Sequence, residues 1–338
     1  MSAGTESTKP ADPESTEPSA SLLGRIPRLD GGQARSAGIV IPFVVLFIVL
    51  SFASSAFFTE ANLLNILDQQ AATLVIAAAG TLVLVSGGID LSVGAIYGLS
   101  AVVAGELALH MPAGLAIAIG VLSGLAAGLF NGVISTFFRI NSLIATLATS
   151  FVFGGIASLV TSGNLVVLSG KPAFGQFANT DLIGVNTSTW VMVAVVVVLG
   201  LFLARSTIGR YMYAAGGNSE AARLAGVRVN WVRVVAFTLS GGAAAVGGII
   251  DSSRVLSAQS TDNTTLTFTV LAGIVIGGTS ILGGEGVVWR TVIGVLFIAL
   301  VGNGYALLGL NPLYEQITLG VLIMLAVGID AWSRGRGR

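Results

Sequence analysis

Residues 81–94 carry the combination of residue types and spacing that is most typical of a functional element. An apolar run ends at Gly87-Gly88, a single carboxylate follows at Asp90, and a second apolar run begins at Leu91. The glycine pair loosens a helix, and Asp90 is placed to accept hydrogen bonds from the free N–H groups of a helix that starts at Leu91. The pattern predicts a broken membrane helix that either lines a transport pathway or forms an ordinary polar turn at the membrane face.

A few further polar side chains inside or near apolar runs could contact a polar solute. The candidate pathway residues are Asp90, Ser92, Asn131, Asn141 and Asn303. Hydrogen bonds between helices explain each of them equally well. Asn303 lies between two glycines, which would let a neighbouring backbone approach it closely. Other glycines are predicted as close-packing positions rather than as pathway lining. These are Gly124, Gly128, Gly241 and Gly242.

Composition excludes several kinds of chemistry. The chain has no cysteine and one histidine, His110, so it lacks a thiolate nucleophile and cannot build a histidine metal cluster. Its formal net charge is zero, which gives no footprint for nucleic acid. No paired carboxylates stand in the middle of an apolar run, so the sequence offers no site for covalent catalysis.

The chain is predicted to be an integral membrane protein. Of its 338 residues 54% are hydrophobic and only 9% are charged, against about 25% charged in soluble proteins. Ten runs without charged residues mark the predicted spans. They cover 36–59, 69–89, 91–105, 111–138, 140–170, 182–204, 234–250, 263–284, 291–314 and 316–329. The last six residues of the long fifth run are expected to leave the membrane. The fold class is therefore an all-α membrane protein with about ten transmembrane helices.

Arginine positions set the predicted orientation. With ten crossings and a cytoplasmic N-terminus, the cytoplasmic side receives Arg139, Arg290, the arginines of 205–233 and those of the C-terminus. The other side receives five carboxylates but only two cations, Lys171 and Arg254. This asymmetry follows the positive-inside rule, so both termini are predicted to be cytoplasmic.

The organisation along the chain follows from the same patterns. Residues 1–35 are rich in Ser, Thr, Pro and Glu and are predicted to form a disordered cytoplasmic tail. Residues 36–332 form the transmembrane domain, with a cytoplasmic loop at 205–233, and residues 333–338 form a second cytoplasmic tail. The polar stretch 164–188 lies outside, either as a solvated loop or as a surface for an external partner.

The loop at 205–233 contains a predicted short helix. Asn218 or Ser219 can cap a helix that runs from Glu220, whose charge is favoured in the first turn, and Gly226 can end it. About two turns are too few to be stable alone. The segment is therefore either a docking helix for a partner or an interfacial connector between two spans.

These residues carry a resemblance to a known family. Glu220-Ala221-Ala222 with Gly226 four residues on is similar to the cytoplasmic coupling motif of ABC importer permeases. Further stretches, in the family's order, resemble signatures of the ribose-type sugar permeases, which belong to the sugar/branched-chain amino acid permease superfamily. They are 62–67 (Asn-Leu-Leu-Asn-Ile-Leu), 86–94 (Ser-Gly-Gly-Ile-Asp-Leu-Ser-Val-Gly), 141–147 (Asn-Ser-Leu-Ile-Ala-Thr-Leu), 215–218 (Ala-Gly-Gly-Asn) and 277–286 (Gly-Gly-Thr-Ser-Ile-Leu-Gly-Gly-Glu-Gly). The resemblance covers about residues 40–330.

The resemblance implies the permease subunit of an ABC importer in the bacterial cytoplasmic membrane, which moves a sugar delivered by an external binding protein. It implies a second permease subunit, in a homo- or heterodimer, and two cytoplasmic ATPase domains that hold ATP and Mg, so that this chain itself carries no cofactor. Coupling to the ATPase would fall on Glu220, Ala221, Ala222, Arg223 and Gly226. The chain has no Gly-x-x-x-x-Gly-Lys-Ser/Thr loop, consistent with ATP binding elsewhere.

Other functions remain as alternatives. One is an ABC permease for another small polar solute, such as a branched-chain amino acid or a sugar-like signalling molecule; the Gly-Gly-Ile-Asp-Leu-Ser pattern favours a sugar. Another is an ion-coupled secondary transporter, but nearly all charges lie at the ends of the spans. Finally, Val-Ser-Gly-Gly at 85–88 and Val-Ile-Gly-Gly at 275–278 form either an internal repeat or a coincidence in a chain with 45 glycines.

Overall fold

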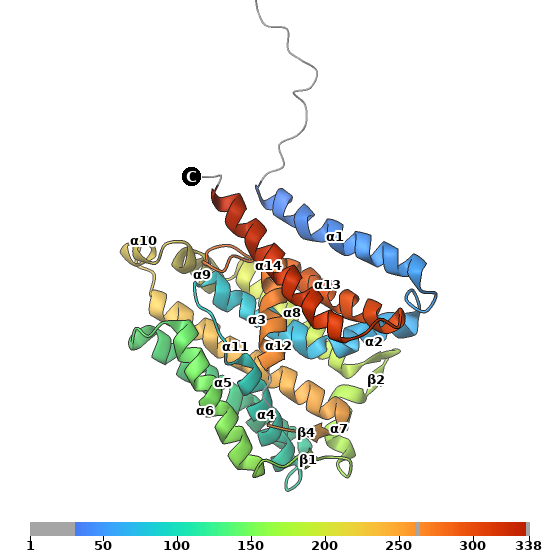
Figure 1. The fold of residues 1–338 in the computed structure, drawn as a ribbon. Helices are drawn as coiled ribbons and strands as arrows, with labels where there is room; N and C mark the ends of the chain where they lie inside the picture. Colours follow the sequence, from blue (N-terminus) through green and yellow to red (C-terminus); the bar gives the residue numbers. More distant parts are fainter. Residues whose placement is uncertain (1–30, 261–263, 336–338) are drawn as a thin grey trace, which may run out of the picture.

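The computed structural model describes residues 31–260 and 264–335, and Figure 1 shows their arrangement. The helices are α1 (Gly31–Ala53), α2 (Glu60–Gln69), α3 (Ala71–Val85), α4 (Val93–Ala108), α5 (Ala113–Phe137), α6 (Ser142–Thr161), α7 (Pro172–Asn179), α8 (Thr187–Arg205), α9 (Thr207–Gly217), α10 (Ser219–Leu224), α11 (Val229–Val255), α12 (Thr264–Ile276), α13 (Val288–Leu307) and α14 (Leu313–Gly335). Two-residue strands are β1 (Val166–Val167), β2 (Asp181–Leu182), β3 (Val185–Asn186) and β4 (Ser257–Ala258). Residues 1–30 of the tail that was predicted to be disordered (1–35) lie outside the described residues, as do 336–338. Residues 31–35 belong to α1, so the prediction is wrong for this end of the tail.

Each of the ten charge-free runs shares most of its residues with one of these helices, so the prediction of an all-α membrane protein is confirmed, while ten spans remain a prediction. Five described helices, α5, α6, α8, α11 and α13, are long and apolar enough to cross a membrane individually. The helices α2 and α3 would make a sixth span together, with a bend of 50° between them. Three further segments are apolar but shorter, namely residues 38–53 of α1, the whole of α4 and the whole of α12.

The centre of the protein is α3, in which every residue is buried, together with α11. Glycines let α11 approach α5 closely. A Cβ added at Gly128 would lie 3.0 Å from the Cα of Gly241, and one at Gly124 would lie 2.5 Å from the Gly241 oxygen. These contacts confirm that the glycines are close-packing positions.

The remaining long helices flank this centre on two sides. In Figure 1, α1, α13 and α14 cover one side, and α5 and α6 cover the opposite side. Helices α1, α2 and α13 share a small core of their own with the α1–α2 loop, made by Leu50, Phe57, Ile66, Ala299 and Leu300. The start of α1 and the end of α14 lie at the same edge of the picture.

Two-residue strands and the short helix α7 cover the ends of several long helices. Strand β1 pairs antiparallel with β4, and β2 pairs with β3 in a small hairpin. Helix α7 is held by the Ser253 hydroxyl, which donates to the Phe174 carbonyl at 2.7 Å. This region carries the polar stretch 164–188.

The helices α3 and α12 end with the same hydrogen-bond pattern. Gly87 N–H donates to Leu84 O and Gly88 N–H to Val83 O, while Gly278 N–H donates to Val275 O and Thr279 N–H to Ile274 O. Gly87 and Gly278 hold positive φ angles of 81° and 78°. The two helix ends are therefore structurally alike, but Gly87 corresponds to Gly278 rather than to Gly277, one residue away from the sequence match.

Candidate functional site

The break between α3 and α4 is longer than the sequence predicted. Helix α4 begins at Val93 rather than Leu91, and Ser92 occupies the N-cap position. The Asp90 carboxylate accepts from Ser92 N–H at 3.0 Å and from the Ser92 hydroxyl at 2.6 Å. The expected capping of a helix at Leu91 is thus wrong, because Asp90 bonds within its own turn and so holds residues 90–92 out of the helix.

Asp90 is the centre of a buried polar chain that joins three parts of the structure. Its second carboxylate oxygen accepts from the Ser240 hydroxyl of α11 at 2.9 Å. The Ser92 hydroxyl accepts from the Asn131 amide of α5 at 2.7 Å. Asp90, Ser92 and Asn131 are 3%, 0% and 0% exposed, so none of them contacts solvent in this conformation. The chain fixes the break against α5 and α11.

Hydroxyls of α6 and α12 satisfy the backbone of the break. Ser142 accepts from Ile89 N–H at 3.1 Å, Thr146 accepts from Leu91 N–H at 3.0 Å, and Thr267 accepts from Gly94 N–H at 3.1 Å. Non-helical backbone at membrane depth requires such partners. Sequence reasoning did not single out these three side chains as partners of the break.

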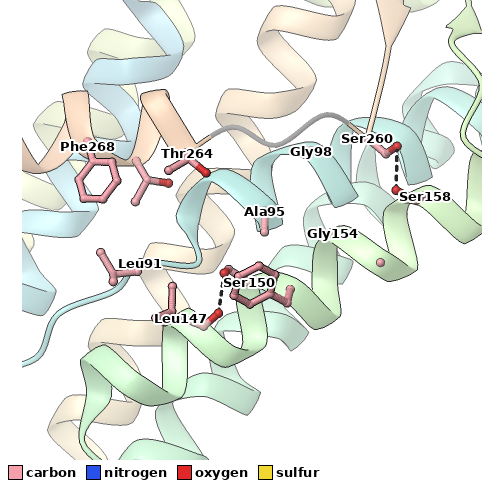
Figure 2. A pocket seen from close by; sticks show the side chains of 13 residues that line it. Leu91, Ala95, Gly98, Leu147, Ser150, Gly154, Ser158, Ser260, Thr264 and Phe268 are labelled. Atoms are coloured by element: carbon pink, nitrogen blue, oxygen red, sulfur yellow. Dashed lines mark hydrogen bonds between the residues drawn. The ribbon is translucent and has the colours of Figure 1, made fainter.

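A cavity of about 450 Å³ adjoins the break between α4, α6 and α12. Figure 2 shows its lining, in which Leu91 of the break and Ala95 of α4 face Leu147, Ser150 and Gly154 of α6. Hydroxyls from Ser150, Ser158, Ser260, Thr264 and Thr267 and the rings of Phe151 and Phe268 complete the lining. No carboxylate or cation is among the described residues of this lining. Mild polarity with two aromatic rings suits a neutral, hydroxyl-bearing solute that must also leave.

The α6 part of this lining occupies one helix face. Positions 147, 150, 151, 154, 155 and 158 share that face through their spacing. Residue type does not distinguish it in the sequence, because Thr146, Thr149 and Thr161 place polar side chains on the buried face of the same helix.

The other candidate pathway residues lie elsewhere. Asn141 is exposed, caps α6 by accepting from Leu143 N–H at 2.9 Å, and lines a different depression. Asn303 of α13 exchanges two hydrogen bonds with Asn62 of α2, at 2.9 and 3.2 Å. Side chains rather than backbone approach its flanking glycines, since Glu315 lies near Gly302 and Leu50 near Gly304. Neither asparagine lines the cavity.

The short helix predicted in the 205–233 segment is present as α10, which covers Ser219–Leu224. The Asn218 side chain caps it by accepting from Glu220 N–H at 3.1 Å and Ala221 N–H at 3.0 Å. At its end, Gly226 N–H donates to Arg223 O and Val227 N–H donates to Ala222 O. Gly226 has a φ of 85°, so it ends the helix as predicted.

The outer surface of α10 carries a large apolar side chain and a charged pair. Ala222 is 5% exposed and packs inward, whereas Leu224 is 91% exposed. Glu220, Ala221 and Arg223 are also exposed, and Arg223 pairs with Glu220 at 2.6 Å. A partner that docks here would touch Leu224 and Ala221 and would not touch Ala222.

Three glycine pairs meet where α9, the α3 end and the α12–α13 loop converge. Gly284 N–H donates to Val85 O at 2.9 Å. A Cβ added at Gly283 would lie 2.8 Å from the Cα of Gly87 and 3.1 Å from that of Gly216. The Tyr213 hydroxyl of α9 donates to Gly286 O at 2.7 Å, and burial raises its pKa, which keeps it a donor. Helix α9, which leads into α10, is therefore in backbone contact with the broken helix.

Comparison with known proteins places most of the membrane part within one family. Residues 62–327 match the family described as branched-chain amino acid transport system / permease component. The chain is 37% identical over 295 residues to the ribose import permease protein RbsC of Escherichia coli (strain K12), covering 86% of this chain and 92% of that protein. It is 37% identical over 301 residues to RbsC of Bacillus subtilis (strain 168), covering 88% of this chain and 94% of that protein. It is 34% identical over 331 residues to the L-arabinose ABC transporter permease protein AraH of Azospirillum brasilense, covering 96% of this chain and 97% of that protein.

Proposed function

Because the chain belongs to the family of branched-chain amino acid transport system permease components, we propose that it is the permease subunit of a bacterial ABC importer for a sugar. It is a multi-pass membrane transporter subunit rather than an enzyme. The observation that carries the proposal is the full-length similarity to permeases named for ribose and arabinose. These names favour a sugar over the branched-chain amino acid of the family description, and over an ion-coupled transporter.

The cavity beside the break is the proposed sugar pathway. Its hydroxyls can exchange hydrogen bonds with a sugar, and Phe151 and Phe268 offer apolar faces. The same side of α6 exposes Phe151 at 76% and Leu159 at 80%. A second permease subunit, identical or related, would cover this face and close the cavity into a passage.

The proposed topology has ten spans with both termini and the 205–233 segment in the cytoplasm of a bacterial inner membrane. Arginine asymmetry supports it, as does the placement of the start of α1 and the end of α14 at one edge. Two ATPase domains that bind ATP and Mg would dock on α10 through Leu224 and its neighbours. An external binding protein would deliver the sugar at the opposite side, where 164–188 lies.

Coupling would pass through described contacts. A push on α10 moves α9, whose Gly216 touches the α12–α13 loop and the end of α3. The end of α3 leads into the Asp90 turn, which α5, α6 and α11 hold by hydrogen bonds. A shift at the ATPase side would therefore reach the lining residue Leu91 through a continuous path.

The test is to fill the cavity. A Cβ at Gly154 meets nothing within 4 Å, so Gly154→Trp should fold and place an indole in the cavity. Gly114→Trp is the matched control, because a Cβ there also meets nothing and Gly114 lies outside the cavity. Uptake of labelled ribose and arabinose is measured with the ATPase and binding protein present, together with membrane accumulation and subunit association. Loss of uptake in Gly154→Trp alone is expected; equal uptake by both variants would contradict the pathway.

Orientation is tested with single cysteines in this cysteine-free chain. Ala173→Cys in exposed α7 should react with a membrane-impermeant thiol reagent on intact cells. Ser219→Cys and Ser333→Cys should react only after permeabilisation. Labelling of Ser219→Cys on intact cells would overturn the topology.

A further inference from the structure

An arginine-lined cleft lies between the end of α5, the start of α6, α10 and the start of α11. Two adjoining depressions of about 670 and 390 Å³ form it, and they share Thr136, Arg139, Arg223 and Asn230. The larger one adds Arg228 and the smaller one adds Arg233. Gly87 and Gly88 line the cleft, Leu91 lines the hydroxyl-lined cavity, and the two linings have no residue in common.

The cleft carries positive charge that the protein only partly neutralises. Arg223 pairs with Glu220, and Arg233 donates from Nε to Ser86 O at 3.0 Å. The exposed side chains of Arg139 and Arg228 make no hydrogen bond or ion pair to another residue within 31–260 or 264–335. No carboxylate is among the described lining residues. Arg139 has a φ of 56°, a left-handed conformation that is uncommon for a long side chain.

Aromatic and apolar side chains surround the same opening. Phe137 and Trp231 stack edge to face with ring centroids 5.6 Å apart, and they are 47% and 53% exposed. Phe138 is 71% exposed beside them. Exposed aromatic rings next to arginines are typical of the level where helices enter the membrane. In α5 and α6 only 28% of the apolar window is buried, so both helices present apolar surface outward next to the cleft.

We propose that this cleft binds the headgroup phosphate of an anionic phospholipid from the adjacent leaflet. Arg139 and Arg228 would contact the phosphate, Asn230 would donate to its oxygens, and Phe137 and Trp231 would pack against the glycerol and upper acyl chains. A neutral sugar has no need of four arginines, and an acidic protein surface has no need of the aromatic rim. Basic pockets between membrane helices at the cytoplasmic face are suited to lipid headgroups. Lipid binding here goes beyond the proposed transport function and does not depend on which solute the permease carries.

The test measures lipid binding to the purified, full-length permease in detergent by native mass spectrometry. Phosphatidylglycerol and phosphatidylcholine are titrated in parallel. The test variant is Arg139→Gln with Arg228→Gln. The control is Arg205→Gln with Arg210→Gln, which removes the same charge from exposed positions outside the cleft. Wild type and control should prefer phosphatidylglycerol, and the test variant should bind it about 30-fold more weakly, roughly 5-fold for each arginine.

Several outcomes would overturn the proposal. Equal binding of the two lipids by wild type would exclude recognition of the anionic headgroup. Displacement of the lipid by inorganic phosphate would show a simple anion site. Retained lipid preference with loss of ATPase co-purification in the test variant would show a protein-docking surface. If the double variant does not fold, Arg228→Gln alone carries the test, with the 5-fold loss expected.

Discussion

Adjacent glycines at the end of α9 allow a sharp test of the glycine contact between α9 and the broken helix. A Cβ at Gly216 would lie 2.5 Å from Gly284 N and closer still to Val85 O, the two atoms that share a hydrogen bond. At Gly217 the nearest atom to an added Cβ is the Cα of Gly284, at 4.0 Å. We therefore predict that Gly216→Ala disrupts the contact and that Gly217→Ala does not.

The expected difference follows from two terms. Insertion of a methyl group against fixed backbone costs about 1–3 kcal/mol, because the neighbours must move by roughly 1 Å. Loss of the hydrogen bond between Gly284 and Val85 adds about 1 kcal/mol, since Val85 is fully buried. The gain in helix propensity, about 1 kcal/mol, applies to both positions because both lie in α9. Gly216→Ala should be less stable than Gly217→Ala by about 2–4 kcal/mol.

The assay compares thermal unfolding in detergent with sugar uptake in cells. Gly216→Ala should unfold at a lower temperature, and the protein that remains should transport poorly because α9 and α10 are displaced from the break. Gly217→Ala should resemble the unaltered protein in both measurements. Equal unfolding midpoints and equal uptake for the two variants would refute the argument that backbone contact at this point is required.

Three further predictions concern single side chains. Asp90→Asn should keep the bond to Ser92 N–H and lower the free energy of unfolding by about 1 kcal/mol, whereas Asp90→Ala should lower it by about 2–3 kcal/mol because it leaves buried donors unpaired. Equal thermal unfolding midpoints for the two variants would contradict this. Gly226→Val should reduce ATPase co-purification because a branched side chain at a φ of 85° costs about 1–2 kcal/mol or more, while Gly226→Asn should retain it. A loss in both variants would show that the position tolerates no side chain, whatever its φ preference. Asn303→Ala should lower stability by about 1 kcal/mol and leave the KM for uptake unchanged, since Asn303 bonds Asn62 far from the cavity; a raised KM would place it in the pathway.

Local signals in the sequence determined the helices and several of their ends. Charged residues interrupt the apolar runs, and each run contains a helix because a membrane segment must satisfy its own backbone. Asn218 and Gly226 bound α10 as predicted, because capping depends on residues within one turn. The boundary at Asp90 was missed by two residues, since its carboxylate could bond to Ser92 as readily as to a first helical turn.

Tertiary structure alone decided which faces are inside and which distant segments meet. In apolar spans no alternation of polar and apolar residues marks the buried face, so spacing could choose neither the lining face of α6 nor its partners, α4 and α12. Both Ala222 and Leu224 suit a short helix, and only packing against the rest of the chain turns the alanine inward and the leucine outward. Gly87, the pair 216–217 and the pair 283–284 are more than sixty residues apart in sequence. The folded helices bring them into backbone contact, and the absence of a Cβ lets the three segments approach this closely.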